Sequence, residues 1–283
     1  MKIGFIGAGR VGFSLGKYFF EKGLSISGYY SRTYRSAYEA SKFTDSNCYE
    51  KLNDLIKNSD TIFITTPDDV IHDIWNEMCN LNIKDKIICH TSGSLSSEIF
   101  SNINNSGAFG YSIHPMFPFC DKFNDYKKLN TAYFSIEGDT KYLDYLYSVL
   151  VSLGNKVLLM KPQNKKLYHL ANVTVSNLVL SIINLGCEYL NKCGISNEDA
   201  INAFFPLIES NIKNLKENGV LRAITGPVER GDIGTIKKHI EVIPSEDKEM
   251  YKCLSSNLLK LSKIKNSEVN YGELEEYLGG IYK

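Results

Sequence analysis

A glycine-rich turn near the start of the chain constrains the fold more strongly than any other feature. The apolar residues 2–6 are typical of a buried strand, and a helical pattern runs from about Arg10 to Lys22. Between them lies the motif Gly-x-Gly-x-x-Gly, which consists of Gly7, Ala8, Gly9, Arg10, Val11 and Gly12. In a strand–turn–helix unit these glycines allow a tight turn, close approach to a pyrophosphate, and close packing of helix on strand. Because the helix start also offers free N–H groups to phosphates, the motif predicts a Rossmann-type dinucleotide site. The alternatives are a structural turn and a nucleotide loop of the methyltransferase type.

The residues after the second predicted strand, Leu24–Tyr30, indicate which dinucleotide binds. A site for NAD or FAD usually carries Asp or Glu there, to bind the ribose hydroxyls. This chain has Ser31, Arg32 and Thr33 instead. The Arg32 guanidinium can pair with a 2′-phosphate or stack on adenine, and the two hydroxyls can assist it. The sequence therefore predicts NADP as cofactor in preference to NAD. The alternative is that Arg32 is an ordinary solvated surface residue.

The pattern of elements changes near residue 160. Before it, strands alternate with helices, which predicts a doubly wound, mainly parallel α/β sheet. Further strand-like segments are Thr61–Thr65, Lys86–His90, Ala108–Ile113 and Ala132–Ile136. After it the signal is helical, with helices predicted from Lys165 to about Cys193, from about Asn197 to Glu217, and from Asp232 onward. We therefore expect a Rossmann domain over residues 1–160 and a helical domain over residues 161–283.

Composition narrows the classes of partner. The chain has 32 basic and 32 acidic residues, so its formal net charge is zero, which argues against bulk binding to nucleic acid or anionic membranes. The most apolar stretch, Val173–Leu185, contains several amides and hydroxyls, and no leader precedes the first strand, so no membrane span or signal peptide is expected. The seven cysteines show no metal-type spacing and indicate reduced thiols in a cytoplasmic protein.

Three polar clusters follow predicted strands. In an open parallel sheet, ligands bind beyond the carboxyl ends of the strands. Thr66 and Pro67 are therefore expected to line the cofactor, and His90 with Ser92 is expected near the nicotinamide. His114 follows a third strand and is a further catalytic candidate. Each histidine can equally be a packed, hydrogen-bonded core residue.

The start of the long predicted helix adds a fourth cluster. Tyr168, His169 and Asn172 share one helix face with Lys165 and Ser176. A polar stripe at the start of an otherwise apolar helix suits a cleft between domains, although an exposed first turn would show the same pattern.

Beyond Asn177 this helix is apolar on nearly all sides. Such a helix must be covered, and we expect a second subunit to cover it. The sequence thus predicts a homodimer whose interface includes Leu178, Ile182 and Leu185.

The segment Thr225–Asp232 has fixed loop chemistry, because it contains Gly226, Pro227 and Gly231. Asp232 is well placed to N-cap a helix that ends near Ile240. Arg230 can present a guanidinium to a substrate carboxylate or phosphate. A metal site made of His90, His114, His169 and Asp232 is conceivable from their residue types. It has no ligand-type spacing, and no metal is predicted.

Taken together, the motifs resemble those of a known group of proteins. They are GFIGAGRVG (Gly4–Gly12), HTSG (His90–Gly93), IHP (Ile113–Pro115), YHLAN followed by SN (Tyr168–Asn172, Ser176–Asn177), and TGPVERGD (Thr225–Asp232). The chain is similar to two-domain NADP oxidoreductases that join a Rossmann-like domain to a helical domain of unknown function. That group is related to the 6-phosphogluconate and β-hydroxyacid dehydrogenases, ketopantoate reductase and pyrroline-carboxylate reductase. The resemblance implies a second domain like the C-terminal domain of 6-phosphogluconate dehydrogenase, and a homodimer.

One departure from these relatives bears on mechanism. β-Hydroxyacid dehydrogenases carry Lys and Asn four residues apart on the long helix, whereas here Tyr168 stands four residues before Asn172. The lysine acid/base is therefore not carried over to this position.

The predicted function is that of an NADP-dependent oxidoreductase acting on a small carbonyl, imine or hydroxy-acid substrate with an anionic group. His169 or Tyr168 would serve as the acid/base, since histidine titrates near neutral pH. Asn172 and Ser92 would orient the substrate, and Arg230 would anchor its anionic group. Two alternatives stay open: a non-enzymatic sensor of NADP(H), and a reductase that passes hydride to a deazaflavin.

Overall fold

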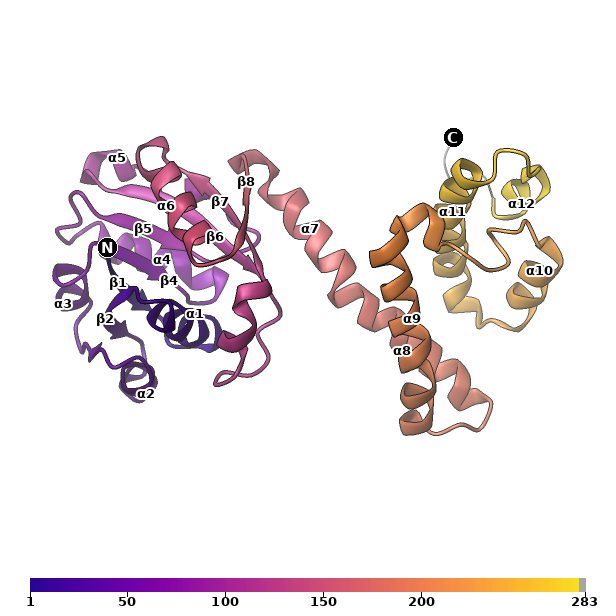
Figure 1. Ribbon diagram of the computed structural model, residues 1–283, viewed down its shortest axis with the longest axis horizontal. Helices are drawn as coiled ribbons and strands as arrows, with labels where there is room; N and C mark the ends of the chain where they lie inside the picture. Colours follow the sequence, from indigo (N-terminus) through magenta and orange to yellow (C-terminus); the bar gives the residue numbers. More distant parts are fainter. Residues whose placement is uncertain (280–283) are drawn as a thin grey trace. The chain divides into compact units, whose positions relative to one another are not determined.

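The computed structural model describes residues 1–279, and these form two compact units divided between Leu180 and Ser181. The first unit is built on a sheet of eight strands in the order β3-β2-β1-β4-β5-β6-β7-β8 (Figure 1). Neighbouring strands are parallel except for β6 and β7, which are antiparallel. The strands are β1 (Lys2–Ile6), β2 (Ser25–Tyr30), β3 (Asn47–Cys48), β4 (Thr61–Ile64), β5 (Ile87–His90), β6 (Phe109–Met116), β7 (Tyr133–Gly138) and β8 (Lys156–Leu159).

Helices follow most of these strands and then make up the rest of the described chain. Those before residue 160 are α1 (Arg10–Glu21), α2 (Tyr34–Phe43), α3 (Leu52–Lys57), α4 (Asp68–Met78), η1 (Ser97–Ile99), α5 (Ile103–Ser106), η2 (Asp125–Thr131) and α6 (Thr140–Ser152). Those after it are η3 (Pro162–Asn164), α7 (Lys165–Val175), α8 (Asn177–Lys192), α9 (Asn197–Ala223), α10 (Ile233–Val242), η4 (Ser245–Asp247), α11 (Lys248–Lys265) and α12 (Gly272–Tyr277).

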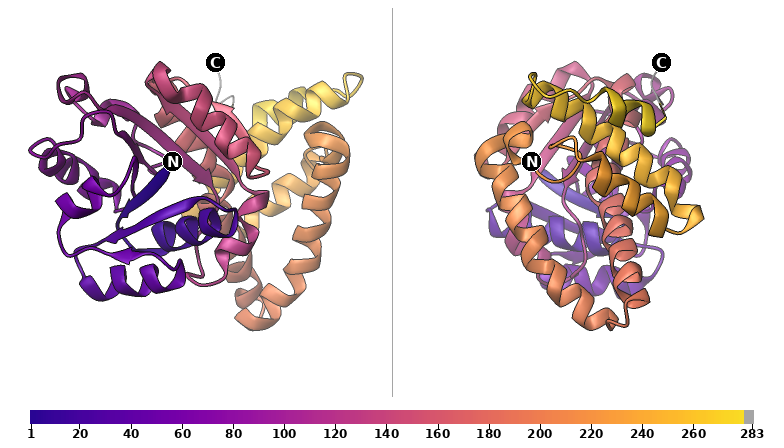
Figure 2. Two further views of the ribbon diagram at one scale, coloured as in Figure 1. Left: turned by 60° about the vertical axis from the view of Figure 1, so that its left-hand side comes forward. Right: turned by 90° about the vertical axis from the view of Figure 1, so that its right-hand side faces the viewer.

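The sheet is covered on both faces (Figure 2). Side chains alternate along each strand, so Phe5 packs with α1 and α2 on one face while Ile6 packs with α3 and α4 on the other. The first core contains Phe13, Phe19 and Leu146, and the second contains Trp75 and others from α3 and α4. This arrangement confirms the predicted doubly wound, mainly parallel sheet followed by helices.

The last strand ends at Leu159, yet the first compact unit extends to Leu180. The reason is that α7 is built into the α/β unit: Lys165 at its start is 1% exposed. The helix predicted to run unbroken from Lys165 is in fact interrupted at Ser176, whose φ and ψ are −115° and −76°. The Ser176 hydroxyl donates to the Asn172 carbonyl at 2.7 Å, a local bond that often bends helices.

The second unit has a smaller apolar core, formed by Val228, Ile236, Leu259 and residues of α12. Asp232 caps α10 as predicted, since its Oδ1 accepts a hydrogen bond from the Thr235 N–H at 3.0 Å.

One helical stretch, Pro162–Lys192, is long and apolar enough to cross a membrane by length and composition alone. A single stretch of this kind is weak evidence. Its first turn also places Lys165 in the interior of the α/β unit, which a lipid-embedded segment would not do. The absence of a membrane partner stays a prediction, with this packing in its favour.

Candidate active site

The glycine turn has the geometry that a dinucleotide requires. Gly7 has a φ of +102°, which favours glycine, and the Thr65 hydroxyl donates to its carbonyl at 2.9 Å. A Cβ on Gly12 would lie 2.3 Å from Thr65 Oγ1, so only glycine lets α1 approach so closely. By contrast, a Cβ on Gly9 would meet nothing within 4 Å. The open space at Gly9, before a helix start that no side chain caps, fits a pyrophosphate group.

The three non-glycine residues of this motif differ in their exposure to solvent. Ala8 is buried, Val11 is half-buried, and Arg10 is exposed at the start of α1. Arg10 is thus accessible to a phosphate.

At the end of β2, Arg32 and Thr33 are exposed and Ser31 is half-buried. The following helix α2 has no side-chain cap and no acidic residue in its first turn, while Arg35 is also exposed. Free N–H groups and two guanidinium groups therefore surround this position. The surroundings fit a phosphate and lack the carboxylate that would bind a free ribose 2′-hydroxyl.

The end of β4 adds Thr66 and Pro67. The Thr66 hydroxyl is buried and has no hydrogen-bond partner within residues 1–279, while Pro67 is exposed just before α4. Asp68, the first residue of α4, accepts hydrogen bonds at 2.7 Å from the hydroxyls of Ser92 and Ser94. The carboxyl ends of β4 and β5 are thereby linked.

His90 is fully buried and both of its ring nitrogens are used within its own loop. Nδ1 accepts from the Ser92 N–H at 3.2 Å, and Nε2 lies 3.1 Å from the Ser96 carbonyl oxygen, to which it donates. Burial lowers the pKa of His90 to about 4, so the ring stays neutral. This geometry suits a residue that shapes the loop and positions Ser92.

His114, Tyr168 and His169 converge over the same loop. The Tyr168 hydroxyl oxygen lies 2.7 Å from His114 Nδ1. A Cβ on Gly93 would lie 2.8 Å from His169 Nδ1 and 2.9 Å from His114 Nε2, so glycine is what lets the two imidazoles meet there. His169 Nδ1 is buried without a hydrogen-bond partner among the described residues. An unpaired buried nitrogen is costly, and it marks a place where a ligand can bind.

The electrostatics of this group keep protons off His114 and on Tyr168. Burial lowers the pKa of His114 to about 3, and the nearby Lys165 charge acts in the same direction. Burial raises the pKa of the Tyr168 hydroxyl, although the nearby polar side chains of Ser135 and Asn172 act in the opposite direction. Asn172 itself donates to the Tyr168 carbonyl at 2.8 Å and is half-buried.

Sequence reasoning missed a polar face of the sheet beside this group. His90, Ser112 and Glu137 form one row across β5, β6 and β7, and His114 pairs with Ser135 in the next. Their neighbours along the strands, such as Tyr111, Ile113, Phe134 and Ile136, point into the apolar core on the other face. The alternation of polar and apolar residues in 111–116 and 133–138 was the available signal.

Two charged residues are buried on this face. Glu137 is 1% exposed, and its carboxylate accepts hydrogen bonds from the Ser97 N–H at 2.8 Å and the Ser97 hydroxyl at 2.6 Å. Lys165 is equally buried, with its Nζ 3.5 Å from Ser135 Oγ. Burial raises the pKa of Glu137 and lowers that of Lys165 to about 8.

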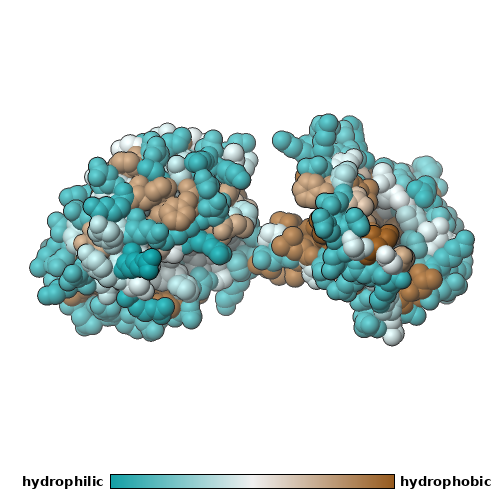
Figure 3. All heavy atoms as spheres, turned by 90° about the horizontal axis from the view of Figure 1, so that it is seen from below, coloured by the Kyte–Doolittle hydropathy of each residue, from teal (hydrophilic) through white to brown (hydrophobic). Residues whose placement is uncertain are grey.

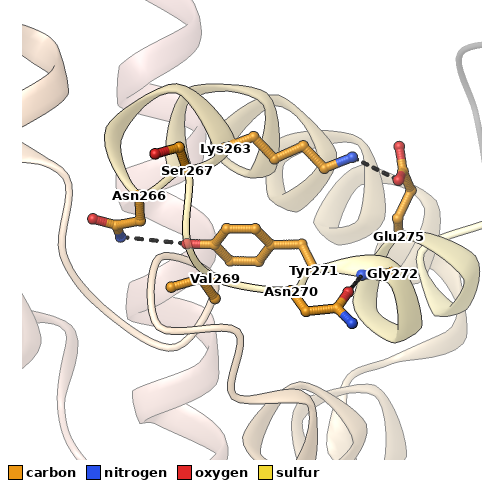
Figure 4. A pocket seen from close by; sticks show the side chains of 8 residues that line it. All are labelled: Lys263, Asn266, Ser267, Val269, Asn270, Tyr271, Gly272 and Glu275. Atoms are coloured by element: carbon orange, nitrogen blue, oxygen red, sulfur yellow. Dashed lines mark hydrogen bonds and ion pairs between the residues drawn. The ribbon is translucent and has the colours of Figure 1, made fainter.

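Arg230 lies in the second unit and is exposed. The loop that carries it is fixed through its neighbour Glu229, which forms a salt bridge of 3.0 Å with Lys265 and accepts from Asn266 at 2.9 Å. Tyr271 donates to the Glu229 carbonyl. Figure 4 shows Asn266 and Tyr271 pointing toward each other at the side of a shallow pocket in this unit. Whether Arg230 reaches a substrate stays a prediction.

Asp232 and His90 already have hydrogen-bond partners that occupy their polar atoms. Both carboxylate oxygens of Asp232 bind Thr235, through its N–H and its hydroxyl. His90 is saturated by its own loop. Within residues 1–279, no group of three His, Cys, Asp or Glu side chains is placed to hold a metal ion.

Comparison with known proteins agrees with this geometry. A model of a Rossmann-like domain matches residues 1–115, and a model of a domain of unknown function, DUF2520, matches residues 132–258. The chain joins a Rossmann-like domain to a DUF2520 domain. This confirms the resemblance inferred from its motifs. The Rossmann-like segment supplies Ser92 and His114, while the DUF2520 segment supplies Ser135, Lys165 and Tyr168.

Solved structures share the fold along almost the whole chain. A "putative NADP oxidoreductase" from Bacteroides fragilis is 23% identical with a TM-score of 0.72, covering 92% of this chain and 98% of that one. A Thermotoga maritima protein is 27% identical with a TM-score of 0.69, covering 94% and 99%. The pyrroline carboxylate reductase of Plasmodium falciparum, with NADP bound, is 16% identical with a TM-score of 0.62, covering 94% and 97%. No curated protein gives a match to this chain.

Proposed function

We propose that the protein is an NADP(H)-dependent oxidoreductase that acts on a small carbonyl, imine or hydroxy-acid substrate bearing an anionic group. The observation that carries this proposal is the convergence of His114, Tyr168 and His169 at the carboxyl ends of β5 and β6. In an open α/β sheet, ligands bind beyond the carboxyl ends of the strands. The sheet order places β4 between β5 and β1, the strand that leads into the glycine turn. NADPH, when bound, would supply the hydride.

Two features support the choice of cofactor. The open backbone at Gly9 fits a pyrophosphate, and the exposed Arg32 and Thr33 fit a 2′-phosphate. Proteins of the same fold include the pyrroline carboxylate reductase crystallised with NADP and an imine reductase from a Pseudomonas species. Both names refer to reduction of a C=N bond, which favours an imine or carbonyl substrate.

The roles of the residues follow from their contacts. Tyr168 carries a proton that can be given to a substrate oxygen or nitrogen. His114 stays neutral and can hold the Tyr168 oxygen with an Nδ1–H group, which leaves the tyrosine proton free to point at the substrate. His169 Nδ1 and the Asn172 side chain would orient the substrate, and Ser92 with Asp68 would shape the wall beside it.

A sensor of NADP(H) would need the glycine turn but not the group formed by His114, Tyr168 and His169. Burying several polar side chains and unpaired atoms costs stability and is typical of reactive sites. The cluster around Tyr168 therefore favours a reductase of a small substrate. It favours this function over a sensor and over a reductase that passes hydride only to a deazaflavin.

The test is a two-step measurement on the purified chain. Binding of NADPH and NADH is followed first, by fluorescence of the reduced nicotinamide. Oxidation of bound NADPH is then followed with a panel of small keto acids and cyclic imines. Binding of NADPH without turnover of any compound would contradict the enzymatic proposal and support a sensor.

We further propose a cytoplasmic homodimer. The seven cysteines are free thiols, which suits a reducing compartment. Exposed apolar side chains gather on α8 and α9, and the face shown in Figure 3 has its strongest hydrophobic colours over the helical part of the chain. Such a surface is typical of one that a second subunit covers.

A further inference from the structure

Lys165 carries a buried charge that no carboxylate neutralises directly. Its side chain is 1% exposed, and its Nζ has one hydrogen-bond partner, Ser135 Oγ at 3.5 Å. It forms no salt bridge with any residue from 1 to 279. An ammonium group has three donors and is costly to bury without a partner. A lysine buried in this way on the polar face of the sheet is therefore a candidate for a functional role.

The groups facing Lys165 come from several elements. Glu137 on β7 and Asp68 on α4 favour its charged form, and burial opposes that form. The two histidines of the sheet, His90 on β5 and His114 on β6, are neutral and are disfavoured as cations by the lysine. Lys165 is thus a source of positive charge in this cluster near neutral pH, since its pKa is about 8.

A continuous polar path connects this charge with the site. Ser135 Oγ lies 3.5 Å from Lys165 Nζ on one side, and on the other the Ser135 hydroxyl is close enough to the Tyr168 hydroxyl to lower its pKa. The Tyr168 oxygen is in turn 2.7 Å from His114 Nδ1. Lys165 Nζ also lies 5.1 Å from the centre of the Tyr168 ring. Lysine, serine and tyrosine therefore form a chain that leads from the interior to the substrate position.

We propose that Lys165 supplies the proton of the reduction, through the Ser135 hydroxyl, to Tyr168, which delivers it to the substrate. The proposal rests on the proposed reductase function and extends it. Lys165 does not touch the substrate, and we therefore treat it as a positioning and proton-storing residue behind Tyr168. It lies seven residues before Asn172 and three before Tyr168, in the first turn of α7.

The relay moves one proton from Lys165 to the substrate in three transfers. The Tyr168 O–H bond breaks as its proton binds the substrate oxygen or nitrogen. Ser135 gives its hydroxyl proton to the Tyr168 oxygen and takes one from Lys165 Nζ. Both hydroxyls are then restored, and the ammonium has become an amine. The proton that a reduction consumes has come from Lys165, which regains one from water along the same path after the product leaves.

The pKa of Lys165 suits the role of proton donor. Burial lowers its pKa to about 8, so that it is charged at pH 7 yet can give up a proton. Tyr168 alone is a weak source, because burial raises the pKa of its hydroxyl. An adjacent ammonium stabilises the transient phenolate until the relay refills it.

The test uses three variants of the full chain and one control. Lys165→Met removes the charge, Lys165→Arg keeps a charge that cannot give up its proton, and Ser135→Ala breaks the path but leaves the lysine. Lys166→Met removes the exposed lysine next in the chain. The reduction rate is measured from pH 6 to 10 with the probe from the keto-acid and imine panel. NADPH binding is measured in parallel, and the ¹³Cε signal of Lys165 is titrated by NMR.

We expect kcat to fall on the order of 100-fold in all three variants, the usual contribution of a proton donor. NADPH affinity should stay within twofold, and Lys166→Met should match the wild type. The wild-type rate should decline as pH rises through about 8, in step with the NMR titration of Lys165, and this decline should be lost in Ser135→Ala.

The outcomes separate the relay from the reductase function. Wild-type turnover that Ser135→Ala and Lys165→Met leave unchanged would overturn the relay alone. Rescue of the rate by Lys165→Arg would show that a fixed charge suffices, and would also overturn it. A Lys165 signal that does not titrate below pH 10 would have the same effect. Absence of turnover in the wild type would overturn the reductase function, and the relay with it.

Discussion

At the scale of single residues, the cofactor choice depends on Arg32. Its side chain is exposed after β2 and forms no ion pair within residues 1–279, so its guanidinium is available to a phosphate. We predict that NADPH binds more tightly than NADH. Arg32→Ala should weaken NADPH binding by about 1.5–3 kcal/mol, the range for a hydrogen bond to a charged group, and leave NADH unchanged. Fluorescence titration of both cofactors measures this.

Lys42→Ala is the matched control, because it removes an exposed cation from the last turn of α2. It should leave both affinities unchanged. Equal affinities of the wild type for NADPH and NADH would contradict the prediction.

Lys165 should also give stability a distinct pH dependence. Its folded pKa is lowered by burial to about 8 from the ordinary 10.5, so between these values the unfolded chain binds more protons than the folded one. Stability therefore rises with pH through this window, and the lysine destabilises the fold below it. Relative to Lys165→Met, the wild type should gain about 2–3 kcal/mol from pH 7 to 10.5. Urea unfolding of both proteins at several pH values tests this, and parallel curves would refute it.

At the scale of elements, the sequence predicted the regular parts better than the buried polar face. The glycine turn, the strands β1, β4 and β5, and the cap at Asp232 follow from local rules, and the structure has them. The strand predicted over Ala132–Ile136 stops one residue before Glu137, but β7 continues through Glu137 and buries its carboxylate. Lysine is usually exposed, and nothing local separates the buried Lys165 from the exposed Lys166. Only the packing of α7 on the sheet distinguishes them.

The approach of α7 to the loop after β5 depends on Gly93. A Cβ there would lie 2.8 Å from His169 Nδ1 and 2.9 Å from His114 Nε2. Gly93→Ala should displace both imidazoles and cost about 1–3 kcal/mol, as overpacking does. Activity should fall further than stability, while NADPH binding at the glycine turn is kept. Melting temperature and NADPH titration measure the two effects.

Gly234→Ala provides the contrast, since a Cβ in that helix would meet only Asp232 Oδ1 at 3.6 Å. It should be neutral or stabilising by about 0.5–1 kcal/mol. A melting temperature of Gly93→Ala equal to that of the wild type, with unchanged turnover, would contradict the packing argument.

At the scale of the whole molecule, the apolar surface of α8 and α9 remains to be explained. Leu178 is 50% exposed, Leu180 66% and Ile182 44%, and Leu185 is half-buried. On α9 the exposed apolar residues are Ile201, Phe205, Leu207, Ile212, Leu215 and Val220. Fully burying one such side chain contributes about 1.5–3 kcal/mol, so covering several of them supplies a strong drive to associate. A second copy, which carries the same apolar helices, is the partner we propose.

We predict a homodimer at tens of micromolar, held in part by Leu178 and Ile182. The double variant Leu178→Asp, Ile182→Asp places two carboxylates in the apolar surface, where they would lose hydration on association. It should be a monomer that still binds NADPH, because both substitutions lie on α8, whereas the glycine turn lies between β1 and α1. Val242→Asp is the control: Val242 is 83% exposed at the end of α10, outside α8 and α9, and its substitution should leave the dimer intact. Light scattering coupled to size-exclusion chromatography measures all three masses. A wild-type mass near the 31.9 kDa of one chain would refute the homodimer.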